Sequence, residues 1–541
     1  MLRRLLPITL AITAVLSAAA ARAADAPTVV TIDTGKLEGA EKAGVLSFKG
    51  VPFAAQPVGD LRWRPPQPAP HWSGVKPATA FGHDCLQGVI KNDPGMGTEL
   101  GEDCLYVNVW RPAAAKPGKK LPVMVWFYGG GLVNGGTQPE IYQGDNFARD
   151  GVVFVSVNYR LGRFGFFAHP ALTTEHPSEL KGNYGFMDQL EGLKWVQRNI
   201  AAFGGDPKQV TIFGESAGGF SVHALVASPL TKGLFERAIV ESGGGRGQMG
   251  NGLHLPAAEQ VGVAFGKSVG VDGSDAAALA KLRALPADKV TGNLNMYTSA
   301  SNTSTYTGPI MDGRLAVESP GRAYREGRQN KVAMITGGNT ADLGFNFSRN
   351  MDELMAPFGA KKAEALATYD PQGTGTLAPA RSKVGMDQIM LEPARYVAKT
   401  FATQGLPSWE FRFDYVGDGM KARAPNGAPH ASEIPFVFDK YAETYIGIVS
   451  PTHSGSPTAL DSQVARTMHA YWVNFAKTGD PNGAGLPPWP RYSAAKDELM
   501  VFQRDGTAKA QPDPWKARME LTEAASEATI KAAEAKEPTV K

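Results

Sequence analysis

Residues 211–219 constrain the fold of this chain more than any other stretch. They contain Ser216 in the pattern Gly-x-Ser-x-Gly, with Gly214 and Gly218 at the fixed positions. Apolar residues before the motif predict the end of a buried strand, and residues 220–226 can form a helix. A strand that reverses sharply into a helix strains the backbone at the turn, and flanking glycines let neighbouring backbone pass close by.

A serine at such a turn stands exposed at the top of a sheet, beside a helix N-terminus, as in the nucleophile elbow of an α/β-hydrolase. Because glycine and serine are common, the five-residue pattern alone is weak evidence. A serine hydroxyl needs a base to take its proton, and the base needs a carboxylate that orients it. In α/β-hydrolases these residues follow in the order serine, acid, histidine.

The best candidate for the base is His430. It lies in a Gly/Pro-containing loop, residues 427–435, after a strand predicted at residues 409–415, where a base could lean back over the serine. A loop histidine without a role is the alternative. The weaker candidates lie in a Ser/Gly/Pro-rich loop, in a helix-like stretch and in the helix predicted after the serine (His453, His469 and His223).

The acid should follow a strand and precede the histidine, and Asp342 meets both conditions. It comes after the strand predicted at residues 332–336. Asp312 stands before a glycine, which is typical of a turn. The alternative is that another carboxylate, such as Asp352 or Glu353, takes the place of Asp342.

A glycine triplet, Gly129 to Gly131, follows an apolar strand predicted at residues 121–127. A tetrahedral intermediate carries an oxyanion that needs preorganised N–H donors. We expect these donors to be the backbone amides of Gly130, Gly131 and Ala217. A phosphate-binding loop is the alternative, but no Gly-Lys-Ser/Thr follows the triplet. The sequence has no His-Glu-x-x-His motif and no Cys/His cluster, so it predicts no metal and no cofactor.

Strands and helices alternate along the chain. The predicted strands include residues 102–110, 121–127, 152–160, 234–243, 332–336 and 409–415, the last clear core strand, and helical patterns cover 183–203, 254–300 and 350–405. Such alternation predicts an α/β fold, with a large, mostly parallel central sheet covered by helices on both faces. Residues 28–46 predict a small N-terminal antiparallel region.

The length of 541 residues and the hydrophobic content of 43% suit one large globular domain. We assign residues 24–515 to an α/β-hydrolase domain. The tail, residues 516–541, is rich in Ala, Glu and Lys and is interpreted as a solvated helix or disorder. The net charge of +3, without a basic stripe, argues against nucleic acid as a partner.

The first 23 residues have the parts of a secretory signal. Two arginines precede an apolar stretch, residues 5–20, and Ala21-Arg22-Ala23 is a cleavage site. A membrane anchor is the alternative, but the stretch is short and alanine-rich, and no later segment of the sequence is long and apolar enough to span a bilayer. We therefore expect an exported bacterial protein, periplasmic or extracellular, with no membrane association once the signal is removed.

The expected export determines how the two cysteines, Cys85 and Cys104, are interpreted. In an oxidising compartment a lone pair of cysteines at this separation favours a disulfide. Two free thiols are the alternative.

Several stretches form a set spread along the chain. They are Phe48-Lys49-Gly50-Val51-Pro52-Phe53-Ala54, Glu102-Asp103-Cys104-Leu105-Tyr106-Val107-Asn108-Val109, Asn158-Tyr159-Arg160-Leu161-Gly162, Gly182-Asn183-Tyr184-Gly185-Phe186-Met187-Asp188-Gln189, Phe203-Gly204-Gly205-Asp206-Pro207, Gly214-Glu215-Ser216-Ala217-Gly218-Gly219 and Trp472-Val473-Asn474-Phe475-Ala476-Lys477-Thr478-Gly479-Asp480-Pro481-Asn482. As a set, they resemble the type-B carboxylesterase family of cholinesterases, liver carboxylesterases and bacterial para-nitrobenzyl esterases. The resemblance spans residues 27 to 505 and implies hydrolysis of small-molecule esters.

The resemblance also implies roles for single residues. Ser216 would be the nucleophile, His430 the base and Asp342 the acid, with a disulfide between the two cysteines. Glu215 would be a buried acidic neighbour of the site, and Ser242 a residue that supports it without reacting. The structural ion pairs of the family would be Arg62 with Glu102, and Arg160 with Asp188.

The chain departs from the family pattern at three places. The acid is usually Glu followed by Gly, whereas Asp342 is followed by Leu343, so a backbone shift must meet the shorter side chain. The histidine is usually followed by Gly, and here Ala431 stands there. His is common before the glycine triplet, and here the residue is Tyr128.

Two other functions use the same scaffold. A catalytically dead relative would act by binding, as the adhesion members of the family do, but those typically lack the serine that this chain keeps. An amidase or transacylase would keep the same catalytic residues. The sequence predicts neither the acyl and alcohol groups of the substrate nor the oligomeric state.

Overall fold

The computed structural model describes residues 28–90, 99–247, 250, 252–441 and 457–535. The predicted signal sequence, His453 and residues 536–541 lie outside these ranges.

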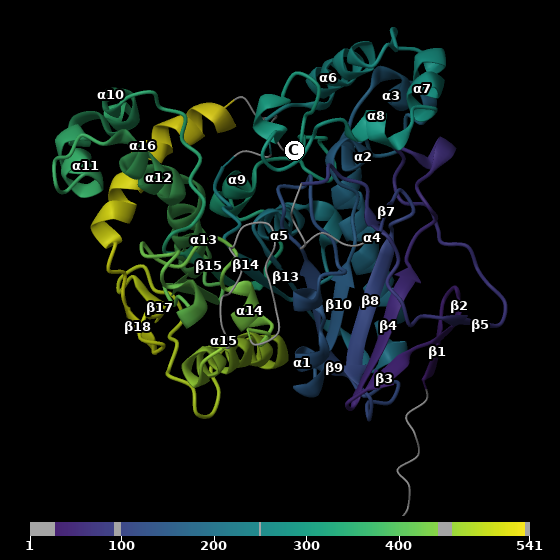
Figure 1. The fold of residues 1–541 in the computed structure, drawn as a ribbon, viewed down its shortest axis with the longest axis horizontal. Coiled ribbons are helices and arrows are strands. Elements are labelled where there is room, and N and C mark those ends of the chain that lie inside the picture. Colours follow the sequence, from purple (N-terminus) through teal and green to yellow (C-terminus); the bar gives the residue numbers. More distant parts are fainter. Residues whose placement is uncertain (1–27, 91–98, 248–249, 251, 442–456, 536–541) are drawn as a thin grey trace, which may run out of the picture.

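An eleven-stranded sheet forms the centre of the molecule, in the order β18-β17-β16-β15-β14-β13-β9-β10-β8-β4-β3 (Figure 1). The strands are β3 (Ala40–Lys42), β4 (Val45–Pro52), β8 (Tyr106–Pro112), β9 (Leu121–Phe127), β10 (Val153–Val157), β13 (Gly205–Glu215), β14 (Arg237–Glu241), β15 (Ala333–Asn339), β16 (Ser408–Phe413), β17 (Glu498–Phe502) and β18 (Ala508–Pro512). Neighbours from β10 across to β17 pair in parallel, and the pairs at both edges are antiparallel. The expected large, mostly parallel sheet is confirmed.

The central parallel strands are buried on both faces, which explains the largely apolar sequences of β9 and β10. β10 reads Val-Phe-Val-Ser-Val and is buried throughout, and the last five residues of β9 are also buried. A strand covered by helices on both sides has no solvent-facing positions, so it needs no alternation of polar with apolar residues. β16 is the exception, because Ser-Trp-Glu-Phe-Arg-Phe alternates although the strand is buried throughout.

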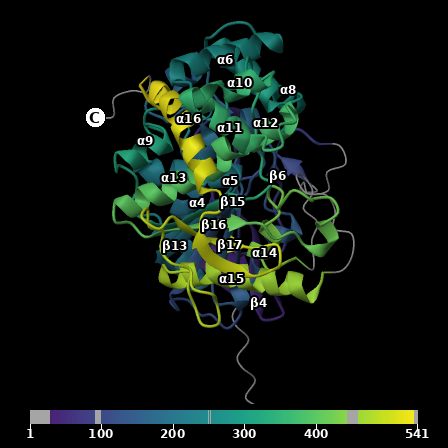
Figure 2. The same ribbon diagram turned by 90° about the vertical axis from the view of Figure 1, so that its left-hand side faces the viewer.

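Helices cover both faces of the sheet (Figures 1 and 2). On one face lie α4 (Tyr184–Asn199), α5 (Ala217–Ala227) and α13 (Glu392–Thr403), and on the other lie α1 (Asp145–Arg149), α14 (Ile434–Val437) and α15 (Ala459–Thr478). Within the described ranges, no helix is both long enough and apolar enough to cross a bilayer.

Further helices gather beyond one end of the sheet in two groups (Figure 1). One group contains α2 (Gly162–Gly165), α3 (Pro170–Glu175), α6 (Leu255–Ser268), α7 (Ala276–Arg283) and α8 (Ala287–Thr291). The other contains α10 (Met351–Met355), α11 (Lys362–Tyr369), α12 (Leu377–Met386) and α16 (Lys516–Glu534), and α9 (Pro320–Arg325) lies between the groups.

Small sheets complete the fold. The expected N-terminal antiparallel region is present as β1 (Val29–Ile32) and β2 (Gly35–Glu38), to which β5 (Val75–Pro77) adds in parallel. β3, from the same predicted region, and β4, which begins at its end, instead join the edge of the main sheet. The two-stranded sheets are β6 (Asp84–Cys85) with β7 (Leu100–Gly101), and β11 (Phe166–Phe167) with β12 (Gly182–Asn183).

The structure differs from the sequence prediction near the C-terminus. β16 is not the last core strand, because β17 and β18 extend the sheet. The tail contains a helix, α16, but one side of it is buried rather than solvated. Met519, Leu521 and Ala525 pack into clusters with the α10–α12 region, and Arg518 pairs with Asp387. Burial of these apolar side chains holds α16 against the body of the protein.

Candidate active site

The sharp turn predicted at Ser216 is present between β13 and α5. Ser216 has φ 55° and ψ −121°, a strained conformation for a non-glycine residue. The flanking glycines are required sterically: a Cβ on Gly218 would lie 2.0 Å from the carbonyl oxygen of Phe127, and one on Gly214 would lie 2.7 Å from the same oxygen. The strain and the close packing hold Ser216 at the N-terminus of α5.

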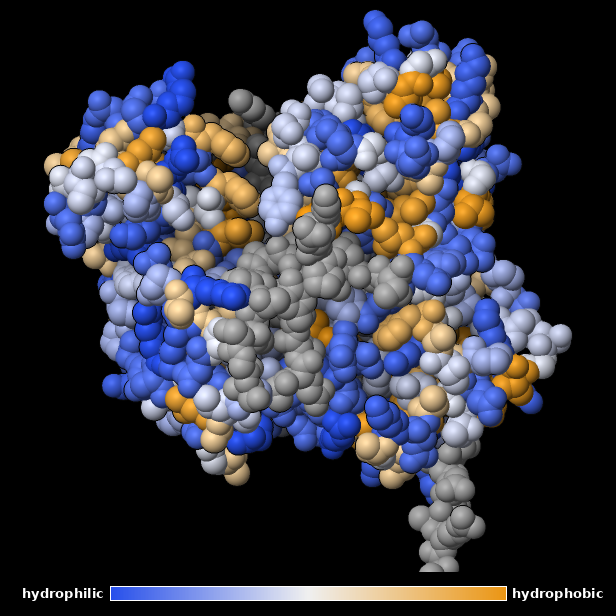
Figure 3. All heavy atoms as spheres, viewed as in Figure 1, coloured by the Kyte–Doolittle hydropathy of each residue, from blue (hydrophilic) through white to orange (hydrophobic). Residues whose placement is uncertain are grey.

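Ser216 is partly exposed, and it lines a pocket of about 400 Å³ together with Gly131 and Ala217. The rest of the described lining consists mainly of glycines and apolar residues from α9, α13 and the segments before them, such as Ile389 and Met390. No charged side chain lines the part of the pocket that the structure describes. Figure 3 shows apolar surface gathering around the hollow between the two helix groups.

His430 and Asp342 meet although they are far apart in the sequence. Nδ1 of His430 lies 2.5 Å from Oδ1 of Asp342, and both side chains are buried. Their loops run side by side, because the N–H of Ala341 donates to the carbonyl oxygen of Ala428 over 2.8 Å and Ala341 forms a β-bridge with Pro429. This bridge brings the loops close enough for the short aspartate side chain to reach the imidazole.

The carboxylate of Asp342 accepts further hydrogen bonds. The hydroxyl of Ser242 donates to Oδ2 over 2.6 Å, the N–H of Asn339 donates to the same oxygen over 2.8 Å, and the N–H of Leu343 donates to Oδ1 over 2.8 Å. These donors fix the orientation of the carboxylate, which is the support expected from Ser242.

The other acids considered lie elsewhere. Asp352 pairs with Lys362, and Glu353 pairs with Arg349, both around α10 and at a solvated surface. Asp312 accepts hydrogen bonds from the backbone N–H groups of residues 314–316, as a turn residue does. Among the acids weighed from the sequence, Asp342 is the one that contacts Nδ1 of His430.

The charges around His430 determine its pKa. Burial alone would lower the pKa of His430, but the negative charges of Glu215 and Asp342 and the hydrogen bond with Asp342 raise this pKa to about 9. For Asp342, burial alone would raise the pKa. The charge of His430 and the hydrogen bonds from His430 and Ser242 outweigh burial, and the pKa of Asp342 is lowered. Asp342 is therefore ionised at neutral pH and carries the negative charge that faces Nδ1 of His430.

Glu215 faces the other ring nitrogen. Its Oε1 lies 3.1 Å from Nε2 of His430. Burial, with the negative charges of Glu433 and Asp342, raises the pKa of Glu215 to about 8, although His430 opposes this. A Glu215 that keeps its proton at neutral pH no longer supplies the largest charge that raises the pKa of His430. The proton on Glu215 therefore favours neutral imidazole, the form that can act as a base.

Two further buried glutamates near the site were not singled out from the sequence. Glu433 accepts a hydrogen bond from Asn339, and Glu241 accepts one from the indole N–H of Trp472 over 2.7 Å. Burial raises the pKa of Glu433 to about 7 and raises that of Glu241 as well. The position of Glu433, three residues after His430, was the one sequence signal that could have found it.

The backbone around the site is strained at two more positions. Ser242 has φ 48° and Ala431 has φ 63°. Both values lie in the left-handed region that favours glycine. At Ala431 this strain accounts for a family pattern with glycine after the histidine.

The glycine triplet lies against the elbow. A Cβ on Gly129 would stand 2.6 Å from Oε2 of Glu215 and 3.1 Å from Cβ of Ser216. Gly130 has φ 100°, and the N–H of Asn134 donates to its carbonyl oxygen over 2.9 Å, which closes a tight turn. The triplet and the elbow are therefore in direct contact, and the chain can present backbone N–H groups from both.

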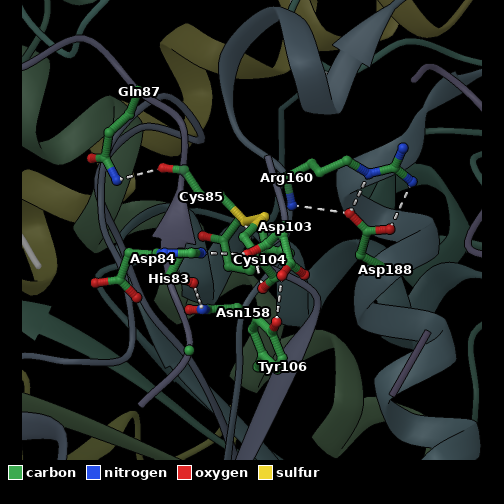
Figure 4. The surroundings of a disulfide bond; sticks show 12 residues. His83, Asp84, Cys85, Gln87, Asp103, Cys104, Tyr106, Asn158, Arg160 and Asp188 are labelled. Carbon is green, nitrogen blue, oxygen red and sulfur yellow. Dashed lines mark hydrogen bonds and ion pairs between the residues drawn. A yellow bond between two sulfur atoms is a disulfide. The ribbon is translucent and has the colours of Figure 1, made fainter. Parts of the chain in front are cut away.

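The Cys85–Cys104 disulfide is present, as predicted. Figure 4 shows it between the segment that contains Asp84 and Gln87 and the segment that contains Asp103. Arg160 donates two hydrogen bonds of 2.8 Å to the buried Asp188. Arg62 pairs with Glu102. Among the described residues, no His, Cys, Asp and Glu group could hold a metal ion.

Several known proteins resemble this chain in sequence and in fold. The model of the carboxylesterase family matches residues 26–368 and 359–520. A fumonisin B1 esterase of Sphingopyxis macrogoltabida is 34% identical over 493 residues, covering 89% of this chain and 88% of that protein. The para-nitrobenzyl esterase of Bacillus subtilis (strain 168) is 34% identical over 504 residues, covering 90% and 96%. A solved PNB esterase structure superposes with a TM-score of 0.75 at 29% identity, covering 92% of this chain and 99% of that one.

Proposed function

Since this chain belongs to the carboxylesterase family and is a carboxylic-ester hydrolase, we propose that it cleaves small-molecule esters through an acyl-enzyme on Ser216. The observation that carries the proposal is the hydrogen-bonded pair of His430 and Asp342, together with a strained serine that opens into an apolar pocket and directly follows Glu215, which contacts His430. These are the three residue types of a serine-hydrolase triad, in the chain order of an α/β-hydrolase.

In the acylation step, the hydroxyl of Ser216 attacks the ester carbonyl carbon while Nε2 of His430 takes the hydroxyl proton. Asp342 holds the proton on Nδ1 and stabilises the imidazolium that forms. When the tetrahedral intermediate collapses, the bond to the alcohol oxygen breaks, and the imidazolium returns its proton to the leaving alcohol. Ser216 is left as an acyl ester.

Deacylation repeats these steps with water. His430 removes a proton from a water molecule, which attacks the acyl carbonyl, and the second tetrahedral intermediate releases the carboxylic acid and the serine hydroxyl. In both steps the backbone N–H groups of Gly130, Gly131 and Ala217 would donate to the oxyanion. The contact between the triplet and the elbow, and the position of Gly131 and Ala217 on the pocket wall, support this role.

The pocket favours substrates whose acyl or alcohol group is apolar and uncharged at this position. Its described lining offers glycines and residues such as Phe220, Ile389 and Met390. Transfer of a carboxylate into such a lining is unfavourable unless a cation or donors compensate for the lost hydration.

We also propose that the protein is exported. The predicted signal sequence and the Cys85–Cys104 disulfide support this location, because disulfides persist in oxidising compartments.

Matched ester and amide substrates with the same acyl group test the proposed reaction class. Hydrolysis of the ester, with amide turnover lower by orders of magnitude, supports an esterase, whereas comparable amide turnover would indicate an amidase. A screen over acyl length and alcohol size then defines the preferred substrate. Absence of any turnover of esters by the purified protein would favour a binding role.

A further inference from the structure

The segment that follows Cys85 is bound to the loop that carries the glycine triplet. The carboxamide of Gln87 makes a two-sided contact with Gly135: Nε2 donates to the carbonyl oxygen over 2.7 Å, and Oε1 accepts from the N–H over 2.8 Å. Nε2 also donates to the carbonyl oxygen of Cys85 over 3.0 Å, a contact visible in Figure 4. Gln87 is buried, so all three hydrogen bonds are sheltered from water.

Neighbouring contacts join the same two segments. The side chain of Asn134 donates to the carbonyl oxygen of Gly88 over 2.8 Å and to Oε1 of Gln87 over 3.2 Å. The N–H of Thr137 donates to Oδ1 of Asp84 over 2.9 Å. Residues 134–137 are therefore held from one side by residues 84–88.

This attachment bears directly on the glycine triplet. The N–H of Asn134 donates to the carbonyl oxygen of Gly130, so the turn that orients the triplet is closed by a residue that Gln87 contacts. At Gly130 there is no room to spare, because a Cβ there would lie 2.3 Å from the carbonyl oxygen of Asn134. A shift of residues 134 and 135 would thus rotate the peptide groups of the triplet.

The disulfide anchors the segment that carries Gln87. Around Cys85 the segment has only the two-residue strand β6 as regular structure, and the bond to Cys104 ties it to the chain just before β8. Backbone hydrogen bonds from the N–H of Asp84 to Glu99 and from the N–H of Leu86 to Gly101 tie the segment to the same neighbouring stretch of chain, a few residues before Cys104.

We propose that Gln87 is a positioning residue for the oxyanion hole, and that the Cys85–Cys104 disulfide keeps Gln87 in register with Gly135. The inference rests on the proposed function, because it assigns Gln87 a part in stabilising the oxyanion that forms on attack by Ser216. Loss of one correctly placed oxyanion donor costs about 10²- to 10³-fold in kcat in serine hydrolases. Misplacement of the loop should cost less, about 10- to 100-fold.

Gln87→Met tests this, since it keeps the length of the side chain and removes every hydrogen bond. We expect kcat for a neutral ester to fall about 10- to 100-fold with little change in KM, and the affinity for a trifluoromethyl ketone to fall by a similar factor, because that inhibitor forms an oxyanion. Gln197→Met is the matched control: the Gln197 carboxamide bridges the carbonyl oxygens of Pro207 and Leu234, away from the site. It should leave kcat and inhibitor affinity unchanged.

A second variant covers the case in which Gln87→Met fails to fold. Gln87→Glu keeps the shape, but when ionised it places a carboxylate oxygen against the carbonyl oxygen of Gly135. Protonation restores a donor there, so the kcat of this variant relative to wild type should recover as the pH falls. A ratio independent of pH, or a Gln87→Met protein that is less stable but has unchanged kcat and inhibitor affinity, would overturn the inference.

The proposed role of the disulfide is tested separately, by measuring kcat of variants that lack it. Cys85→Ser with Cys104→Ser should lower kcat, and adding Gln87→Met should lower it by less than the product of the separate factors, because both changes act through the same loop. Multiplicative effects would refute that link. Hydrolysis at the wild-type rate in Ser216→Ala would contradict the proposed function itself, whereas Ser216-dependent hydrolysis with the same kcat in the Gln87 variants would contradict this inference alone.

Discussion

Replacement of Asp342 by asparagine keeps the shape of the side chain and removes its charge, and the surroundings of the carboxylate determine the result. Oδ1 accepts from Nδ1 of His430 and from the N–H of Leu343, and Oδ2 accepts from Ser242 and from the N–H of Asn339. An amide has one oxygen and one NH₂ group, so one of these positions must become a donor.

Both orientations of the new amide are harmful. With NH₂ toward His430, the amide donates to Nδ1, and the imidazole proton moves to Nε2, where the base must accept a proton from Ser216. With NH₂ toward Asn339, two donors face each other, and the charge that stabilises the imidazolium is lost. We expect kcat to fall by about 10³ to 10⁴, which corresponds to roughly 4–5.5 kcal/mol of activation free energy. The unpaired backbone N–H should cost about 1–3 kcal/mol of the free energy of unfolding.

Steady-state turnover of a chromogenic ester measures the first effect, and urea unfolding measures the second. Asp352→Asn is the control, because that exposed carboxylate pairs with Lys362 and should tolerate the change without loss of kcat. Asp342→Glu lengthens the side chain by one methylene and should retain partial activity at most. If folded Asp342→Asn keeps more than about a tenth of wild-type kcat, Asp342 does not act on His430 as described, because triad asparagine variants lose far more.

Three further outcomes are expected. Glu215→Gln fixes the uncharged form that Glu215 has at neutral pH, so the acid limb of the kcat/KM profile, where His430 becomes protonated, should stay at the wild-type pH; a limb at clearly lower pH would show that an ionised Glu215 raises the pKa of His430 and would contradict this. Peptide mapping of unreduced protein should find Cys85 linked to Cys104, and the double serine variant should lose about 3 kcal/mol of unfolding free energy, since the bond closes a loop between cysteines 19 residues apart. Esters whose acyl chain ends in a carboxylate should show kcat/KM about tenfold or more below that of neutral esters of equal length, because no charged side chain lines the described part of the pocket; equal values would refute this.

Much of the fold follows from the sequence because the parallel core strands are buried on both faces. β9, β10 and the end of β13 are largely apolar runs, interrupted only by single residues such as Ser156 and Thr211, and such runs are typical of buried strands. β18, in contrast, is a partly exposed edge strand of sequence Ala-Lys-Ala-Gln-Pro, and its strand character comes from pairing with β17 rather than from its own residues. The buried side of α16 could not be predicted either, because the helices that it contacts are distant in the sequence.

The residues of the candidate site likewise fall into those that local sequence patterns predict and those that they do not. Ser216 follows from a local motif with a local steric cause, and His430 and Asp342 follow from chain order and from their positions after strands. Gln87 and Glu241 contact residues that are distant in the sequence, Gly135 and Trp472 respectively. No local sequence pattern predicts such contacts. The hydrogen bonds of Gln87 and Glu241 are therefore seen only in the folded structure.

The most direct test of the account is covalent labelling of its nucleophile. A fluorophosphonate should inactivate the protein with a stoichiometry near one, and mass spectrometry of the digested protein should place the adduct on Ser216. Ser216→Ala should take up no label, keep its fold and lose about 10⁵- to 10⁶-fold in ester turnover, as removal of a triad serine does in other hydrolases. An adduct on a different serine, or a folded Ser216→Ala that still hydrolyses esters at the wild-type rate, would contradict the central claim.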